Sequence, residues 1–157
     1  MGANNRVNYM DVVDRLSAMI AKIGQKLPSV KGILQRPNGE WLVRLDDLDV
    51  VLELDEKTRR MMVSVELSTL SELSEAAVLT HLLQYSFLWR ETGCVYASLN
   101  DELRPVLMVP LFQEELSTDF LTNVLAHMVE KARAFTALIE HLSVASPKQV
   151  QLDEIKI

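Results

Sequence analysis

His127 and Glu130, in the sequence HMVE, are the two residues best spaced to share a metal ion. An imidazole and a carboxylate three residues apart lie on the same side of a helix, and both are common zinc ligands. A zinc site needs three or four ligands, and the sequence shows no third ligand beside this pair. The pair therefore indicates a solvated helix face more strongly than a metal site, and we predict no bound metal.

Two other side chains have usable chemistry, Cys94 and His81. Cys94 follows a glycine and would be an activated nucleophile if nearby cations stabilised its thiolate, but Arg90 is its only basic neighbour in the sequence. We interpret Cys94 as a small packing residue. His81 lies between two apolar stripes of a predicted helix, where it could sense pH in an interface. A hydrogen-bonded surface or interface histidine is the simpler interpretation.

The sequence lacks the common patterns of catalytic and cofactor sites. Its five glycines form neither the G-x-G-x-x-G pattern nor a P-loop, and no H-E-x-x-H is present. An enzyme needs a nucleophile beside a base, paired carboxylates, a metal cluster or a phosphate cradle. We therefore predict that the protein is not an enzyme, with no catalytic residue and no organic cofactor.

Length and composition indicate one domain with a substantial core, because 48% of the 157 residues are hydrophobic. Twenty-two acidic and sixteen basic residues give a formal charge of -6, which argues against nucleic acid or an anionic membrane as partner. One cysteine excludes an intrachain disulfide and suits a reducing compartment. No segment approaches the roughly 20 apolar residues of a membrane span, so we predict a cytosolic protein without membrane insertion.

The first segment predicts an amphipathic helix followed by strands. Apolar side chains recur every three or four residues, with Asn8 as the predicted cap and Gly24 and Pro28 as the predicted end. Further on, the apolar side chains alternate instead, and Asn38-Gly39 is typical of a tight hairpin turn. The connections are too short for parallel crossovers, so we predict an antiparallel meander of three or four strands.

The second predicted helix, residues 68–89, is apolar on two sides. One stripe contains Leu73, Ala76, Ala77, Thr80, Leu83 and Phe87, and the other contains Val78, Leu82, Tyr85 and Trp89. A helix that is apolar on two sides needs two covers. The sheet can cover one side, and a second copy of the chain is the simplest cover for the other. We therefore predict a homodimer.

The rest of the chain completes an α+β fold. Thr92-Gly93 turns the chain into two further strands, residues 117–142 predict a closing helix, and residues 144–157 resemble a polar tail. The predicted fold is a five- to six-stranded antiparallel sheet packed with three helices. Its order is helix, three or four strands, helix, two strands, helix, in a single domain of residues 1–143.

This order, read with LLQYSFLWRETGCVYASLNDELRPVLMVPLF and the following STDFLTNVLAHMVEKARAFTALIEHL, resembles the class I type III secretion chaperones, the Tir chaperone family. The resemblance covers residues 6–142, and Thr92-Gly93 is its one fixed-looking dipeptide. Two features depart from the family pattern. Residues 94–96 are larger than the family's small residues after the turn, and the tail is longer.

The resemblance implies a bacterial cytoplasmic homodimer that holds the N-terminal region of a secreted effector soluble and partly unfolded before export. The secretion-system ATPase is a further candidate partner. If the second helix and the strand after Gly93 form the dimer, the effector has the first helix and the early strands left to bind. The predicted dimer residues are Val78, Leu82, Tyr85, Trp89, Val95 and Tyr96, and the predicted effector contacts are Met10, Val13, Ile33, Leu34 and Leu42.

Two other functions remain open from the sequence. A small-molecule-binding or enzymatic α+β domain would need a cluster of polar groups around a pocket, and such a cluster can be assembled from distant residues. An adaptor for a folded partner would instead need a preformed protein interface. The secretion chaperone is the favoured hypothesis, because apolar surface without chemistry suits a protein that holds another chain.

Overall fold

The structure, a computed structural model, describes residues 3–67 and 75–145. These residues form the predicted α+β order of helix, four strands, helix, two strands and helix, with a short second helix after the first. The helices are α1 (Ala3–Ala21), α2 (Ile23–Lys26), α3 (Glu75–Phe87) and α4 (Thr118–Ala145), with a 3-10 turn η1 (Gln113–Glu115). The strands are β1 (Gly32–Arg36), β2 (Glu40–Arg44), β3 (Asp49–Asp55), β4 (Arg60–Glu66), β5 (Tyr96–Leu99) and β6 (Pro105–Phe112).

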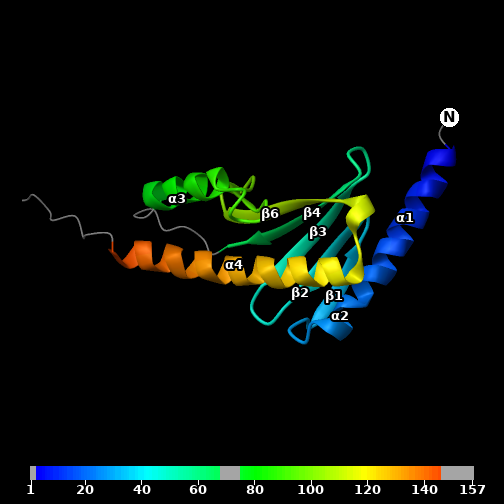
Figure 1. The fold of residues 1–157 in the computed structure, drawn as a ribbon, viewed down its shortest axis with the longest axis horizontal. Helices are drawn as coiled ribbons and strands as arrows, with labels where there is room; N and C mark the ends of the chain where they lie inside the picture. The colour runs from blue at the N-terminus through cyan, green and yellow to red at the C-terminus, as the bar shows by residue number, and fades with distance from the viewer. Residues whose placement is uncertain (1–2, 68–74, 146–157) are drawn as a thin grey trace, which may run out of the picture.

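The strands form one six-stranded antiparallel sheet in the order β1-β2-β3-β4-β6-β5. The meander and its later hairpin were predicted from the sequence, and both are confirmed. Figure 1 shows α4 running along the sheet, with α1 and α2 at one end and α3 beside the C-terminal half of α4. The last strand, β6, lies between β4 and β5, so the two edges of the sheet are β1 and β5.

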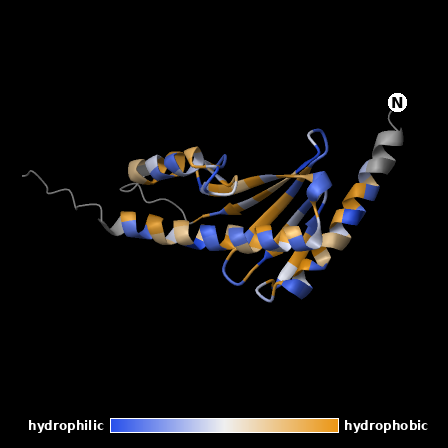
Figure 2. Ribbon diagram, viewed as in Figure 1, coloured by the Kyte–Doolittle hydropathy of each residue, from blue (hydrophilic) through white to orange (hydrophobic). Residues whose placement is uncertain are grey.

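One face of the sheet holds the core. In β2, β3 and β4 every second side chain is buried, as expected for strands with a single covered face. Figure 2 shows hydrophobic residues concentrated along these strands. The buried side chains of the three strands and the residue after each of β2 and β4 are Trp41, Val43, Leu45, Val50, Leu52, Leu54, Met61, Val63, Val65 and Leu67.

Helix α1 covers this face through the stripe predicted from the sequence. Val13, Leu16 and Ile20 are buried in the same cluster as the sheet residues. Trp41, the largest fully buried side chain, donates its indole N–H to Ser17 Oγ at 3.1 Å, and Ser17 donates its hydroxyl to the carbonyl of Val13 at 2.8 Å. The polar atom of the tryptophan therefore has a partner, as burial requires.

The hairpin between β1 and β2 has the predicted turn. Asn38 and Gly39 both adopt positive φ, 67° and 72°, the backbone that an Asn-Gly turn favours. A Cβ at position 39 would lie 2.6 Å from Tyr9 Oη and 3.3 Å from Leu54 Cβ. A larger residue at position 39 would be strained by the positive φ and would crowd Tyr9 and Leu54, so glycine is favoured there.

Predicted ends were wrong at all three long helices, and α3 ends at Phe87, two residues before its predicted end. The first helix begins at Ala3, so Asn8 lies inside it, and α1 ends at Ala21, before the short helix α2 that contains Gly24. The last helix continues to Ala145, two residues into the predicted tail, and residues 146–157 lie outside the described part. Capping residues are also tolerated within helices, so such boundaries are weakly encoded.

Exposed ion pairs connect α4 to the turn between β2 and β3 and to helix α2. Arg133 donates two hydrogen bonds to Asp47, at 2.6 and 3.3 Å, and Lys26 pairs with Asp119 near the start of α4. The hydrogen bond from Arg133 holds the pKa of Asp47 below its usual value. Both pairs are exposed, so they orient α4 more than they stabilise it. The apolar core provides the stability.

Two leucines distinguish the covered and open faces of the sheet. Leu52 is fully buried in β3, and Leu34 in β1 is 56% exposed. We predict that Leu52→Ala lowers the free energy of unfolding by roughly 2–5 kcal/mol, because it removes core packing. Leu34→Ala is the matched control, and it should change the free energy of unfolding by less than about 0.5 kcal/mol. Urea unfolding followed by circular dichroism measures both, and equal losses would contradict the assignment of faces.

Candidate binding surfaces

The residues with usable chemistry do not converge in the structure. His127 and Glu130 are exposed on α4, and among the described residues no group of three His, Cys, Asp or Glu could hold a metal ion. His81 Nδ1 lies 2.8 Å from the carbonyl of Ala77, one turn earlier in α3. This agrees with the interpretation of His81 as a hydrogen-bonded histidine.

Cys94 is exposed, so its interpretation as a packing residue was wrong. The reason is the backbone of the turn: Gly93 and Cys94 have φ of 70° and 62°, and the Cys94 N–H donates to the carbonyl of Trp89 at 2.7 Å. The neighbouring Thr92 is buried in place of the cysteine, and its hydroxyl donates to the carbonyl of Val95 at 2.9 Å.

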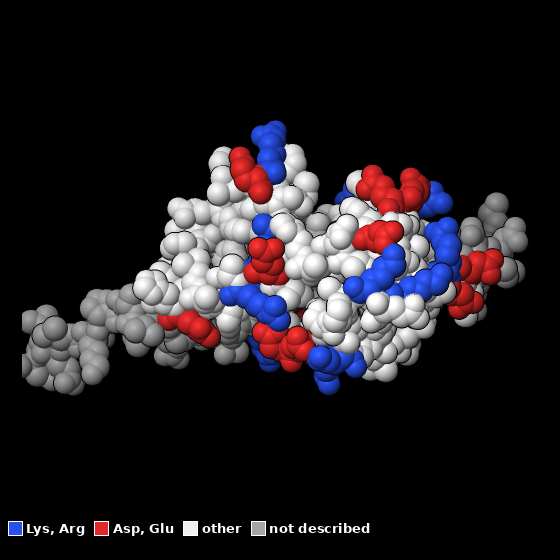
Figure 3. All heavy atoms as spheres, turned by 60° about the horizontal axis from the view of Figure 1, so that its bottom comes forward, with Lys and Arg blue, Asp and Glu red and all other residues white. Residues whose placement is uncertain are grey.

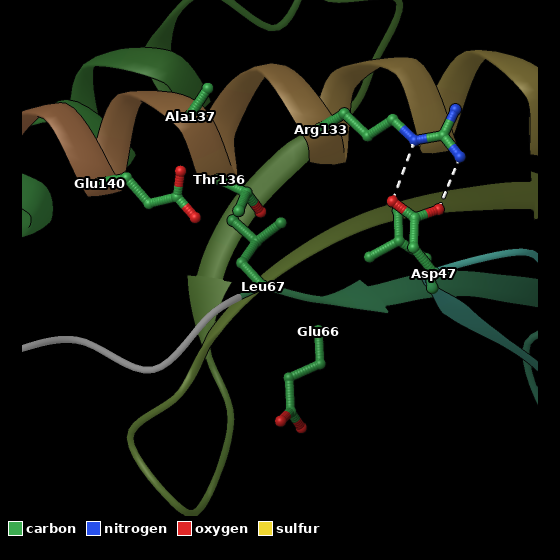
Figure 4. A pocket seen from close by; sticks show the side chains of 8 residues that line it. Asp47, Glu66, Leu67, Arg133, Thr136, Ala137 and Glu140 are labelled. Carbon is green, nitrogen blue, oxygen red and sulfur yellow. Dashed lines mark hydrogen bonds and ion pairs between the residues drawn. The ribbon is translucent and has the colours of Figure 1, made fainter.

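A hollow of about 410 Å³ lies between α4 and the nearby ends of the strands. Figure 4 shows the Arg133–Asp47 pair at one end of it and Glu140 further along α4, with Leu67 between. Its polar lining consists of this ion pair, two further carboxylates and a threonine. The lining contains no histidine, cysteine or lysine, the side chains that serve most often as general base or activated nucleophile.

Helix α3 has one covered and one open apolar side. Val78 and Leu82 are buried, and the Tyr85 ring packs edge-on against Phe135 of α4, with 4.8 Å between ring centroids. Burial also raises the pKa of Tyr85. The opposite side is exposed: Leu83 is 73% and Phe87 83% accessible. Large apolar side chains this exposed on one helix face indicate a contact surface.

The predicted dimer residues therefore divide into two groups. Val78, Leu82 and Val95 are buried within the chain. Tyr85 is half-buried, while Trp89 and Tyr96 remain 39% and 37% exposed. The sequence correctly indicated two apolar sides of the helix, but the side that was assigned to a second copy is the one that the chain itself covers.

The uncovered face of the sheet carries a continuous row of mostly apolar side chains. Strand register places one residue of every strand in this row, each opposite the next. The outer row is Leu34, Leu42, Val51, Ser64, Met108 and Tyr96. None of the six is buried, because the helices lie on the other face. The row therefore presents apolar contact area across the whole sheet.

At the β1 end of the outer row lies a groove of about 290 Å³, lined by Lys31, Gly32, Ile33, Leu34, Leu42 and Arg44. Three of the predicted effector contacts line it: Leu34 and Leu42 lie on the outer face, whereas Ile33 is partly buried against the core. Met10 is exposed on α1 and does not line this groove. Val13 is buried in the core cluster, so the structure places it away from any surface.

Sequence reasoning missed the two cations of the groove. Arg44 makes two hydrogen bonds with Asp49, at 3.0 and 3.1 Å, which lower the pKa of Asp49, and Lys31 pairs with Asp46 at 2.9 Å. Their aliphatic stems line an apolar groove while their charges lie at its rim, a role that residue type alone does not reveal. Figure 3 shows acidic and basic side chains side by side, so neither sign dominates the face that it draws.

Among the described residues, no helix combines the length and the apolar character needed to cross a lipid bilayer. No curated protein matches the sequence.

Several solved structures share the fold. A chain of the ExsC–ExsE complex superposes with a TM-score of 0.68 at 13% identity, over 81% of this chain and 95% of the other. A chain of the HopA1–SchA chaperone–effector complex gives 0.62 at 14% identity, over 78% and 93%. The type III secretion chaperone SycH of Yersinia pestis, solved with a fragment of YscM2, gives 0.58 at 19% identity, over 76% and 98%.

At these identities the structural likeness establishes the fold alone. The sequence supplies the family: the profile of the Tir chaperone protein (CesT) family matches residues 20–136. The match runs from the end of α1 through most of α4, so it includes the complete sheet. The predicted resemblance is confirmed, and the chain belongs to the Tir chaperone protein (CesT) family.

Proposed function

We propose that this chain is a bacterial cytoplasmic chaperone for a type III secreted effector. It binds the N-terminal region of the effector, keeps it soluble and partly unfolded, and aids its delivery to the secretion apparatus, whose ATPase is a further partner. The chain does this without catalytic residues, metal or cofactor. The observation that carries the proposal is the apolar groove beside the free edge of β1 in a chain of the CesT family.

The β1 edge suits an extended segment of another protein. Strand β1 has one neighbour, β2, so its other side offers backbone N–H and C=O groups to a partner strand. Main-chain hydrogen bonds of this kind form with almost any sequence, and neighbouring pockets select side chains. In the proposed complex, apolar side chains of the effector enter the groove between Leu34 and Leu42 and continue along the outer row toward Val51.

Two of the structures with a similar fold support the proposal. They are the HopA1–SchA chaperone–effector complex and the type III secretion chaperone SycH bound to a protein fragment. The two alternatives have less support, since the lining of the 410 Å³ hollow contains no histidine, cysteine or lysine and the open groove lies beside a free strand edge. Purifying the protein from its native cell and identifying what co-purifies with it would decide between the three functions. A bound metabolite or a folded complex, in place of a secreted protein, would contradict the proposal.

We also propose that the functional unit is a homodimer, with the contact moved to the open side of α3. Leu83 and Phe87 are its anchors, and Trp89 and Tyr96 lie exposed in the adjoining turn and strand. Arg90 stacks its guanidinium over the Trp89 ring at 4.7 Å, which holds the indole at the surface. This contact leaves the β1 edge, at the other side of the sheet, free for an effector.

The groove predicts the outcome of one substitution. Leu34→Asp places a charge where an apolar effector side chain would be buried, so it should weaken effector binding at least about tenfold. Because Leu34 is exposed, the variant should keep the helix content and oligomeric state of the wild-type protein. Calorimetry with the co-purified effector's N-terminal segment measures the affinity. Glu53→Asp, on the same face but outside the groove, is the control.

Two results would contradict the site. Unfolding of the Leu34→Asp protein would mean that Leu34 belongs to the core. Unchanged affinity in a folded protein would mean that the effector lies elsewhere.

The open side of α3 predicts the outcome of another substitution. An apolar anchor at the centre of an interface typically contributes about 2 kcal/mol or more, so Phe87→Asp should convert the dimer to monomer at micromolar concentration. The fold should persist, because the Phe87 side chain is exposed in the single chain. Phe112→Asp, at the far end of β6, should remain dimeric. A monomeric wild-type protein in sedimentation equilibrium would disprove the dimer.

A further inference from the structure

The two edges of the sheet differ in whether their backbone groups are free. At β5, Ser86 of α3 makes two hydrogen bonds with one residue, Ala97. Its hydroxyl accepts the Ala97 N–H at 2.9 Å and donates to the Ala97 carbonyl at 2.7 Å. A residue of a neighbouring antiparallel strand would exchange the same two bonds. The serine hydroxyl therefore occupies the place of a strand.

A second hydroxyl acts on the same edge. Thr92, in the turn after α3, is buried and donates to the carbonyl of Val95 at 2.9 Å. Val95 directly precedes β5, whose first residue is Tyr96, so this bond fixes the entry of the chain into the strand. Side-chain hydroxyls thus occupy the N–H and the carbonyl of Ala97 within β5, and the carbonyl of the residue that precedes the strand.

The β1 edge has no such closure. Within the described residues, the hydrogen bonds of the β1 backbone run to β2, and no side-chain hydroxyl or amide bonds to its other side. Strand β1 is also mostly exposed, and the groove lined by Leu34 and Leu42 adjoins it. The sheet is therefore asymmetric: one edge is closed by hydroxyls, and the other is open beside an apolar groove.

We infer that Ser86 and Thr92 close the β5 edge to strand pairing, which leaves β1 as the sole edge of this sheet for an extended partner. Each chain then accepts one added strand, and a second copy of the chain meets α3 through side chains and not through β5 backbone bonds. The closure of β5 stands on the hydrogen bonds alone, whereas the docking of an effector strand at β1 rests on the proposed function. Ser86 is a positioning residue in this arrangement.

Hydrogen exchange of the Ala97 amide, measured by NMR on the full chain, tests the closure. The Ala97 amide should exchange slowly in the wild-type protein although it points away from β6. Ser86→Ala should speed its exchange by roughly tenfold, the equivalent of one net hydrogen bond. Ser86→Thr, which keeps a hydroxyl, should restore slow exchange. Ser98→Ala is the control on β5 itself, because the Ser98 hydroxyl has no bond to Ala97.

The consequence for pairing is tested without an effector, in a Phe87→Asp background that removes the proposed α3 contact. Phe87→Asp alone, and with Thr122→Ala, which removes a hydroxyl that bonds only within α4, should stay monomeric as concentration rises. Phe87→Asp with Ser86→Ala should form larger species in which the Ala97 amide regains protection. Unchanged Ala97 exchange in the Ser86→Ala protein, or a Phe87→Asp/Ser86→Ala protein that stays monomeric, would overturn the inference. Because no effector is present, failure here is distinct from failure of the Leu34→Asp test.

Discussion

The architecture depends on a sheet that is covered on one face only. Apolar and polar residues alternate in β2–β4, so every second side chain is buried in a core that α1 and α4 cover. The remaining side chains have no helix to pack against and form the outer row. The same feature that builds the core thus leaves apolar area open, which a chain that binds unfolded protein requires.

The two edges of the sheet differ as its two faces do. Antiparallel sheets carry unpaired backbone groups at both edges, and natural proteins protect such edges from unwanted pairing. Here part of the protection comes from the turn after α3. Gly93 and Cys94 adopt positive φ in this turn, which allows the Thr92 hydroxyl to donate to the carbonyl of Val95. The Thr92-Gly93 dipeptide noticed in the sequence therefore has a physical role: it positions a hydroxyl against a strand edge.

The sequence predicted the features that depend on local periodicity. The alternation around Trp41 and Val43, the Asn38-Gly39 turn and the α1 stripe each follow from a short segment. It could not predict which side of α3 the chain covers, because both sides are apolar and the choice depends on contact with Phe135, far along the chain. The sequence predicted the apolar residues of the groove but not Lys31 and Arg44. These two residues line the groove with their aliphatic stems, whereas a sequence pattern counts them as charged.

The position of β6 between β4 and β5 has a consequence for the kinetics of folding. The pairs β1–β2, β2–β3 and β3–β4 join neighbours in the chain, while β6 reaches β4 only after α3 and β5 have been passed. Contacts between residues that are close in the sequence form quickly. Contacts across long loops form more slowly, because closing a longer loop costs more entropy. The meander with its open β1 edge is expected to form first. In a chain emerging from the ribosome, the groove would then exist before the opposite end of the sheet is sealed.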